Sequence, residues 1–165
     1  MNMIKVGQSS DIHRLVNDKE LILGGVKIEH HMGLLGHSDA DALCHAIAEA
    51  LIGALGKQDL GTHFPDNDPQ YKGISSLTIL NKVADMIKKE GFQVVNIDSL
   101  IMIEQPKMIT HIPMMRHNIA NALSITEDLV NVKATRGEGL SFIGRQEGVM
   151  AQAVVLIESL KEKQQ

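Results

Sequence analysis

The amino-acid sequence predicts an α/β fold of the α+β type, a sandwich in which helices cover one face of a single sheet. Apolar runs of strand length alternate with amphipathic segments of helix length, and the chain contains no internal repeat or low-complexity linker. Its 165 residues are about the size of one ordinary domain. We therefore expect a single domain over residues 1–165.

Short β-branched or aliphatic runs predict the strands. Gly24-Gly25 separates two of these runs and is typical of a hairpin or a bulge. The first run contains Ile4 and Val6, and the others span 21–23, 26–28, 94–103, 129–134 and 149–157.

Apolar residues at helical spacing predict three helices. Ser38 followed by Asp41 is typical of a capping box at the start of the first helix, which Gly56 should end. Residues 57–74 are rich in Gly, Pro, Asp and Asn, which predicts a long functional loop without regular structure. The other two predicted helices span 76–90 and 114–123.

Composition and charge exclude several classes of protein. Sixteen basic and 20 acidic side chains leave a formal net charge of -4, and the chain has only three Phe and one Tyr to stack on bases, which argues against nucleic-acid binding. A single cysteine excludes an internal disulfide or a Cys-rich zinc site and fits a reducing compartment. No apolar run approaches the roughly 18 residues of a membrane helix. We expect a cytoplasmic protein without membrane contact.

Asp11 and His13 are the first candidate metal ligands. They stand two residues apart on a predicted strand, so both side chains point to the same face. Such a pair is common and is weak evidence for a metal site by itself. His45 on the first helix would complete a zinc site with three protein ligands and one open position, the pattern of a catalytic zinc. Asp41 or Glu49, each one helical turn from His45, could orient its imidazole, and the sequence leaves this choice open.

Six motifs occur in order along nearly the whole chain: DIH, GLLGHSDAD, DLGTHFPDNDP, QPKM, NVKAT and FIGRQEG. Together they make the sequence resemble the 2-C-methyl-D-erythritol 2,4-cyclodiphosphate synthase family. The resemblance implies a homotrimer of ferredoxin-like subunits with active sites at the subunit interfaces. It also implies a lyase of the non-mevalonate isoprenoid pathway, which closes a cytidine-diphospho sugar-alcohol phosphate into a ring and releases CMP.

The resemblance implies two metal ions. Zinc would bind Asp11, His13 and His45, in agreement with the spacing argument. Mg²⁺ or Mn²⁺ would lie between Glu138 and the substrate's phosphates. Two divalent cations would lower the repulsion when the substrate's 2-phosphate attacks its own diphosphate, and no protein nucleophile is needed.

The resemblance also implies which residues contact the substrate. His37 would stabilise the transition state, and Ser38 would bind phosphate; as the cap of the first helix, Ser38 would stand at an anion site in any case. A lid would hold the erythritol hydroxyls, and a loop after the long strand would read cytosine and meet the diphosphate. The implied substrate-binding set is Asp11, His13, His37, Ser38, Asp59, Gly61, Phe64, Pro65, Asp66, Asp68, Pro106, Lys107, Met108, Thr135, Glu138, Phe142 and Arg145.

Two residues depart from the family pattern. Arg136 replaces the second threonine of the family's threonine pair, a proposed transition-state stabiliser, while Thr135 remains. Its guanidinium could supply charge to the reacting phosphates as a catalytic group, or it could turn to solvent. Ala40 replaces the glycine that is usual in the HSDGD motif, and we expect it to suit a first helical turn.

Two other functions use some of the same residues. A metal-dependent phosphohydrolase would use the Asp11, His13 and His45 zinc to activate water and would release inorganic phosphate. A non-catalytic trimer could bind an isoprenoid diphosphate in a central cavity, because Phe142, Arg145 and Glu147 match family residues there. The complete metal triad together with Glu138 favours the cyclase.

Overall fold

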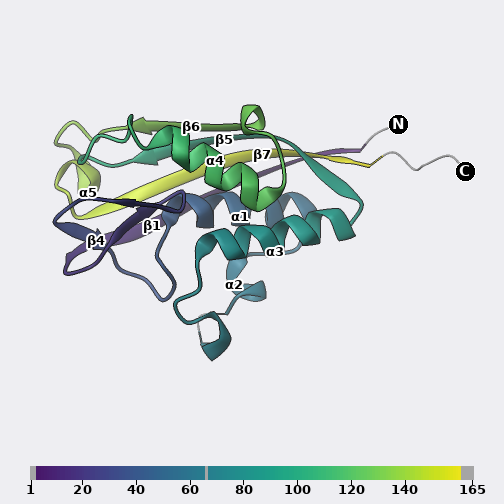
Figure 1. The fold of residues 1–165 in the computed structure, drawn as a ribbon, viewed down its shortest axis with the longest axis horizontal. Helices are drawn as coiled ribbons and strands as arrows, with labels where there is room; N and C mark the ends of the chain where they lie inside the picture. The colour runs from purple at the N-terminus through teal and green to yellow at the C-terminus, as the bar shows by residue number, and fades with distance from the viewer. Residues whose placement is uncertain (1–2, 66, 161–165) are drawn as a thin grey trace, which may run out of the picture.

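The computed structural model describes residues 3–65 and 67–160 and is built around a mixed five-stranded sheet with the strand order β4-β1-β7-β5-β6 (Figure 1). β7 pairs antiparallel with both β1 and β5, whereas β6 runs parallel to β5 at one edge. Two further short strands form a separate antiparallel hairpin. The strands are β1 (Ile4–Asn17), β2 (Leu21–Leu23), β3 (Val26–Ile28), β4 (Met32–Leu34), β5 (Phe92–Met102), β6 (Val130–Thr135) and β7 (Gly148–Ser159).

Helices cover one face of this sheet. One long helix, α1, packs on β1 and β7, and another, α4, packs on β6, while α3 lies against both helices (Figure 1). Almost every side chain of α1 is buried, because the helix lies between the sheet and α3. The helices are α1 (Ala42–Leu55), α2 (Leu60–His63), η1 (Pro69–Tyr71), α3 (Ser76–Lys89), α4 (Ile112–Leu123), η2 (Glu127–Leu129) and α5 (Ser141–Gly144).

These elements confirm the predicted α+β architecture with helices on one face of the main sheet, although β2 and β3 form a second, two-stranded sheet. The split β-α-β unit of ferredoxin-like folds is present, because β7 lies between β1 and β5. β6 is added parallel to β5 through α4, so the sheet is mixed rather than wholly antiparallel. Gly24 and Gly25 have φ angles of 58° and 68° and form the predicted hairpin turn between β2 and β3.

The alternation of β1 positions the functional site. Gly7, Ser9 and Leu15 are buried on the face that meets α1, and Asp11 and His13 share that face. A Cβ atom at Gly7 would lie 1.9 Å from the carbonyl oxygen of Ala50 in α1. The absence of a side chain at Gly7 therefore lets α1 approach β1 closely.

The opposite face of the sheet exposes apolar side chains. Val6, Ile4 and Ile12 of β1 have exposed fractions of 66%, 61% and 55%, and Val154 of β7 has 47%. Val6 and Ile12 alternate with the buried residues, so they point away from the helices.

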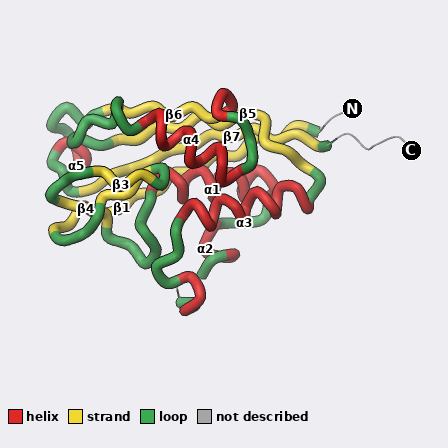
Figure 2. The backbone as a smooth tube through the Cα atoms, viewed as in Figure 1, coloured by secondary structure: helices red, strands yellow, loops and turns green. Residues whose placement is uncertain are grey.

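Three expectations for the segments around α1 were wrong. Residues 57–74 contain the short helices α2 and η1, although most of the segment is loop (Figure 2). α1 begins after Asp41, whose carboxylate accepts a hydrogen bond from the Cys44 amide, so Asp41 rather than Ser38 is its N-cap. Ala40 lies outside the helix with a φ of 55°, a left-handed conformation that glycine adopts more easily, so it does not occupy a first helical turn.

No helix in residues 3–65 or 67–160 combines the length and the apolar character that crossing a membrane requires.

Candidate functional site

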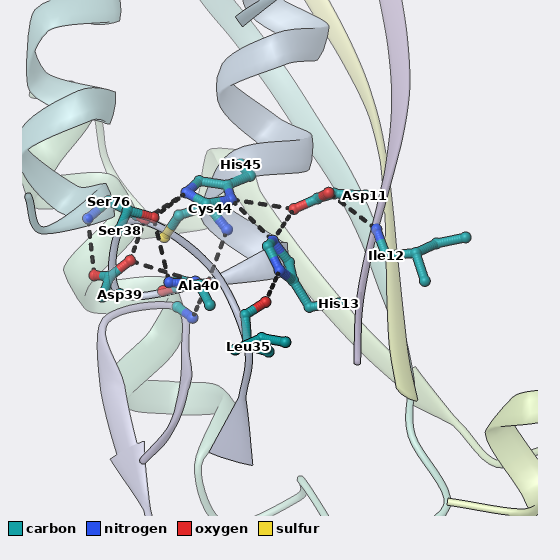
Figure 3. A network of polar contacts seen from close by, with 12 residues as sticks. Asp11, Ile12, His13, Leu35, Ser38, Asp39, Ala40, Cys44, His45 and Ser76 are labelled. Carbon is teal, nitrogen blue, oxygen red and sulfur yellow. Dashed lines mark hydrogen bonds and ion pairs between the residues drawn. The ribbon is translucent and has the colours of Figure 1, made fainter. Parts of the chain in front are cut away.

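The metal triad predicted from the sequence is assembled in the structure. Asp11 and His13 come from β1, and His45 comes from the first turns of α1 (Figure 3). Asp11 Oδ2 lies 3.0 Å from His13 Nε2 and 3.1 Å from His45 Nδ1, and the two histidine nitrogens are 3.4 Å apart. These atoms form a compact triangle of one oxygen and two nitrogens.

This donor set fits a zinc ion. Ligand atoms at about 2.0–2.1 Å from a tetrahedral zinc stand about 3.3 Å from one another, close to the three separations in the triangle. The second nitrogen of His13, Nδ1, lies 2.8 Å from the carbonyl oxygen of Leu35 and donates to it. This hydrogen bond leaves the lone pair of Nε2 directed at the triad, as a metal ligand requires. Three protein ligands would leave one position open.

The contacts within the triad shift the pKa values of Asp11 and His13. Burial alone would raise the pKa of the Asp11 carboxyl, but hydrogen bonds from His13 and His45 outweigh it and hold that pKa well below its ordinary value. Burial alone would lower the pKa of His13, but the Asp11 carboxylate outweighs it and raises that pKa. Asp11 therefore keeps its negative charge beside the two histidines, and a carboxylate held ionised in this way favours a bound cation.

The partners of the remaining nitrogen of His45 were not foreseen. His45 Nε2 lies 2.9 Å from Ser76 Oγ and 3.1 Å from Ser38 Oγ, and Ser76 in turn contacts Asp39 (Figure 3). Asp39 belongs to the GLLGHSDAD motif, so the sequence pointed to this segment but did not predict that Asp39 contacts Ser76. Ser76 is the first residue of α3, and nothing in the sequence pointed to a functional role for it, because a serine at a helix start is common.

Asp41 does not orient His45. Its carboxylate is fully buried and accepts backbone hydrogen bonds from Gly24, Gly25 and Cys44, so it ties the β2–β3 hairpin to α1. Burial raises the pKa of the Asp41 carboxyl. Glu49 lines the cavity beside the triad.

The triad opens into a cavity of about 480 Å³. Its wall joins the end of β1, the loop before α1 and the segment of α2, so it collects the predicted ligands with much of the predicted phosphate and lid sites. The predicted residues that line it are Asp11, His13, His37, Ser38, His45, Gly61 and Phe64.

The predicted nucleotide loop lines a different cavity, of about 510 Å³. This second cavity lies between the segment after β5, the start of α4 and the end of β6. Met108 is buried there, whereas Lys107 is exposed. The predicted residues on its wall are Pro106, Lys107, Met108, Thr135 and Arg136.

The other predicted residues within 3–65 and 67–160 are on neither cavity wall. Asp59 and Asp68 cap the short helices α2 and η1. Arg145 donates two hydrogen bonds to Glu147. Asp66 lies outside the described residues. Pro65, Glu138 and Phe142 also lie outside both cavity walls.

Arg136 contacts Glu104, a residue that the sequence did not single out. Arg136 Nη2 lies 2.9 Å from Glu104 Oε1, and the amide of Gly137 donates to Glu104 Oε2 at 2.8 Å. The hydrogen bond from Arg136 holds the pKa of the Glu104 carboxyl below its ordinary value. Glu104 directly precedes the QPKM motif, so the contact joins the two loops of the second cavity.

Comparison with known proteins identifies the family. The model of the YgbB family matches residues 4–158. The chain is 54% identical over 154 residues to the 2-C-methyl-D-erythritol 2,4-cyclodiphosphate synthase of Pelobacter propionicus, a match that covers 93% of this chain and 98% of the relative. It is 50% identical over 155 residues to the synthase of the same name from Clostridium botulinum, covering 94% of this chain and 100% of the relative.

Solved structures have the same fold. The bifunctional IspDF of Campylobacter jejuni superposes with a TM-score of 0.93 at 37% identity; the match covers 98% of this chain and 44% of that longer protein. A CDP complex of Plasmodium falciparum IspF gives 0.85 at 32% identity and covers 98% of this chain and 99% of that one. The chain therefore belongs to the YgbB family, the family of 2-C-methyl-D-erythritol 2,4-cyclodiphosphate synthases that its six motifs predict.

Proposed function

We propose that the chain converts 4-diphosphocytidyl-2-C-methyl-D-erythritol 2-phosphate to 2-C-methyl-D-erythritol 2,4-cyclodiphosphate and CMP, as a phosphorus–oxygen lyase of the non-mevalonate isoprenoid pathway. The observation that carries this proposal is the triangle of ligand atoms from Asp11, His13 and His45, which faces a cavity lined by His37 and Ser38. Membership of the family supports it, because relatives over almost the whole length bear the name of this activity.

The proposed reaction forms one bond and breaks one. An oxygen of the substrate's 2-phosphate bonds to the β-phosphorus of its diphosphate, and the bond from that phosphorus to the bridging oxygen breaks, so CMP leaves with the electron pair. The substrate supplies its own nucleophile. The protein has to bring two anions together in line and exclude alternative attack by water.

We propose that Asp11, His13 and His45 hold Zn²⁺ and that Glu138 holds Mg²⁺ or Mn²⁺ together with substrate phosphates. Divalent cations would supply the positive charge that lowers the repulsion between the two phosphate groups. Glu138 has a φ of 50° and is exposed on the loop after β6. An exposed carboxylate there is accessible to a cation that arrives with the substrate.

Side chains of the first cavity would bind the phosphate end of the substrate. His37 is exposed beside the triad, and Ser38 Oγ lies 3.1 Å from His45, so both groups border the proposed metal. We propose that Ser38 donates to a phosphate oxygen and that His37 stabilises the charge that develops in the transition state. The α2 segment would form the lid over the erythritol, with Asp59, Gly61, Phe64, Pro65, Asp66 and Asp68.

Side chains of the second cavity would bind the nucleotide end. Backbone groups of Pro106 to Met108 would read cytosine, and the Lys107 ammonium would meet the diphosphate. Thr135 would donate its hydroxyl to the same group. Arg136 gives one nitrogen to Glu104, and we propose that the other donors of its guanidinium contact the diphosphate as a catalytic group.

The two cavities support an active site shared between subunits. The metal residues and the nucleotide loop line separate cavities of one chain, and a second copy would place both around one substrate. The apolar outer face of β1 and β7 would bury its exposed Ile and Val side chains against another copy. We propose a homotrimer with three interfacial sites, in the cytoplasm as the sequence predicts.

The two alternative functions receive less support. A non-catalytic trimer that binds an isoprenoid diphosphate near Phe142 and Arg145 would have no need for an open metal triad. A phosphohydrolase would use the same triad, and its product distinguishes it from a cyclase.

Loss of one triad residue tests the proposal. Wild-type protein should contain zinc and release CMP from the cytidylyl substrate, and His45→Ala should lose both, because two ligands hold zinc too weakly. Mixed trimers of His45→Ala and Glu138→Gln subunits should regain activity, since some interfaces combine the intact halves of the two variants. Full zinc occupancy with normal turnover in His45→Ala would exclude the triad, and no recovery in mixed trimers would exclude shared sites.

A further inference from the structure

We propose that Ser76 and Asp39 are positioning residues that fix the His45 imidazole for metal binding through Nδ1. The inference rests on the proposed metal site and adds to it a hydrogen-bonded chain that reaches from the cavity to the start of α3. Figure 3 shows this chain on the side of His45 that faces away from Asp11.

The hydrogen bonds run without a break from His45 through Ser76 to Asp39. His45 Nε2 lies 2.9 Å from Ser76 Oγ. The Ser76 hydroxyl donates to Asp39 Oδ1, and the Ser76 amide donates to Asp39 Oδ2 over 2.8 Å. Asp39 thus binds the hydroxyl and the amide of one residue with its two oxygens, which fixes the rotamer of Ser76.

Counting protons assigns the direction of each hydrogen bond. A serine hydroxyl has a single proton, and the Asp39 carboxylate can only accept, so this proton points at Asp39. Ser76 Oγ must then accept from its other neighbour, which places a proton on His45 Nε2. An imidazole that is neutral and protonated at Nε2 presents a lone pair at Nδ1, the atom that faces Asp11 and His13.

Burial makes this arrangement rigid. Ser76 has an exposed fraction of 1%, and its backbone belongs to α3, while Asp39 belongs to the loop before α1. The contact therefore joins two segments that border the cavity and holds His45 from the side opposite the triad. Ser38 Oγ also lies within 3.1 Å of His45 Nε2, but with Ser76 as the acceptor its hydroxyl stays available to a substrate phosphate.

Zinc affinity, measured by competition with a chromogenic chelator, tests this role without substrate. Ser76→Ala should bind zinc about 10 to 100-fold more weakly than wild type, because the imidazole loses the partner that orients it. Ser75→Ala is the matched control: Ser75 is the neighbouring residue, exposed and without a capping hydrogen bond, and its loss should leave the affinity unchanged. Thermal denaturation of the metal-free variants would check that each one folds.

A double variant distinguishes a chain of contacts from two separate effects. Asp39→Asn should also weaken zinc binding, because an amide can donate to Ser76 and release its hydroxyl proton toward His45. If Asp39 acts through Ser76, the variant with both changes should bind zinc as Ser76→Ala does. A folded Ser76→Ala with zinc affinity within about twofold of wild type, or fully additive losses, would overturn the inference. Absence of zinc binding in the wild type would instead refute the proposed metal site.

Discussion

The guanidinium of Arg136 occupies the position where this chain departs from the usual threonine pair. Glu104 is nearly buried and accepts from both Arg136 and the Gly137 amide, so the substitution is accommodated by a carboxylate at the base of the loop. A threonine at this position has no positive charge and could not form an ion pair with that carboxylate. The pair therefore holds the arginine at the wall of the second cavity with donors to spare.

Removal of this side chain should affect the chemical step. Arg136→Ala should lower kcat by about 100-fold, the typical cost of one lost donor to a developing oxyanion. Arg136→Thr should recover a good part of the loss, because a hydroxyl can still donate one hydrogen bond. Steady-state kinetics with the cytidylyl substrate would measure both. If each variant stays within a few-fold of wild type, Arg136 only orders the loop.

Single residues also show where sequence reasoning reaches its limit. The triad of Asp11, His13 and His45 was predictable as a candidate metal site, because the strand period and the family motifs agree on it. Ser76 was not, because it contacts His45 through an approach of α3 that no local pattern encodes. The sequence left open whether Asp41 or Glu49 orients His45, and the Asp41 carboxylate instead binds a hairpin 16 to 17 residues away in the sequence.

At the scale of elements, the distance between β1 and α1 determines whether the triad can form. β1 supplies two residues of the triad and α1 the third, and the missing side chain of Gly7 allows β1 and α1 to approach closely. The long helices and all strands except β4 were predictable from periodicity, and β4, with only three residues, was missed. α2 and η1 were not predictable either, because they have four and three residues and their caps, Asp59 and Asp68, are also common turn formers.

A methyl group at Gly7 should therefore separate these elements. The added Cβ would lie 1.9 Å from the Ala50 carbonyl oxygen, so Gly7→Ala should lower the free energy of unfolding by about 1–3 kcal/mol or more and weaken zinc binding. Gly53→Ala in α1 is the matched control, because its Cβ would meet no atom within 4 Å, and it should stabilise by about 0.5–1 kcal/mol. Urea unfolding would measure both. Equal stability of Gly7→Ala and wild type would contradict the close approach.

At the scale of the whole molecule, the chain has two separate cavities and an exposed apolar sheet face. The proposed homotrimer would account for both, because a second copy would bring the two kinds of cavity together and cover that face. The sequence indicated this assembly only through the family resemblance, since the alternation of β1 predicts two faces but not what covers each of them.

A charge on that face should prevent assembly. Wild type should scatter light as three chains of 18.1 kDa, whereas Val6→Lys should give a smaller, inactive species, because an ammonium would be buried at the interface. Met114→Lys changes an exposed apolar residue of the helical layer and should leave the mass unchanged. A Val6→Lys protein that remains trimeric would place the interface elsewhere.

The product formed by purified, metal-loaded protein tests the account most directly. Phosphorus NMR of a reaction with 4-diphosphocytidyl-2-C-methyl-D-erythritol 2-phosphate, zinc and magnesium would follow every phosphate in the mixture. The proposed cyclase predicts two coupled resonances from a cyclic diphosphate, together with the single resonance of CMP. Inorganic phosphate without a cyclic product would show that the Asp11, His13 and His45 site activates water, and would contradict the account.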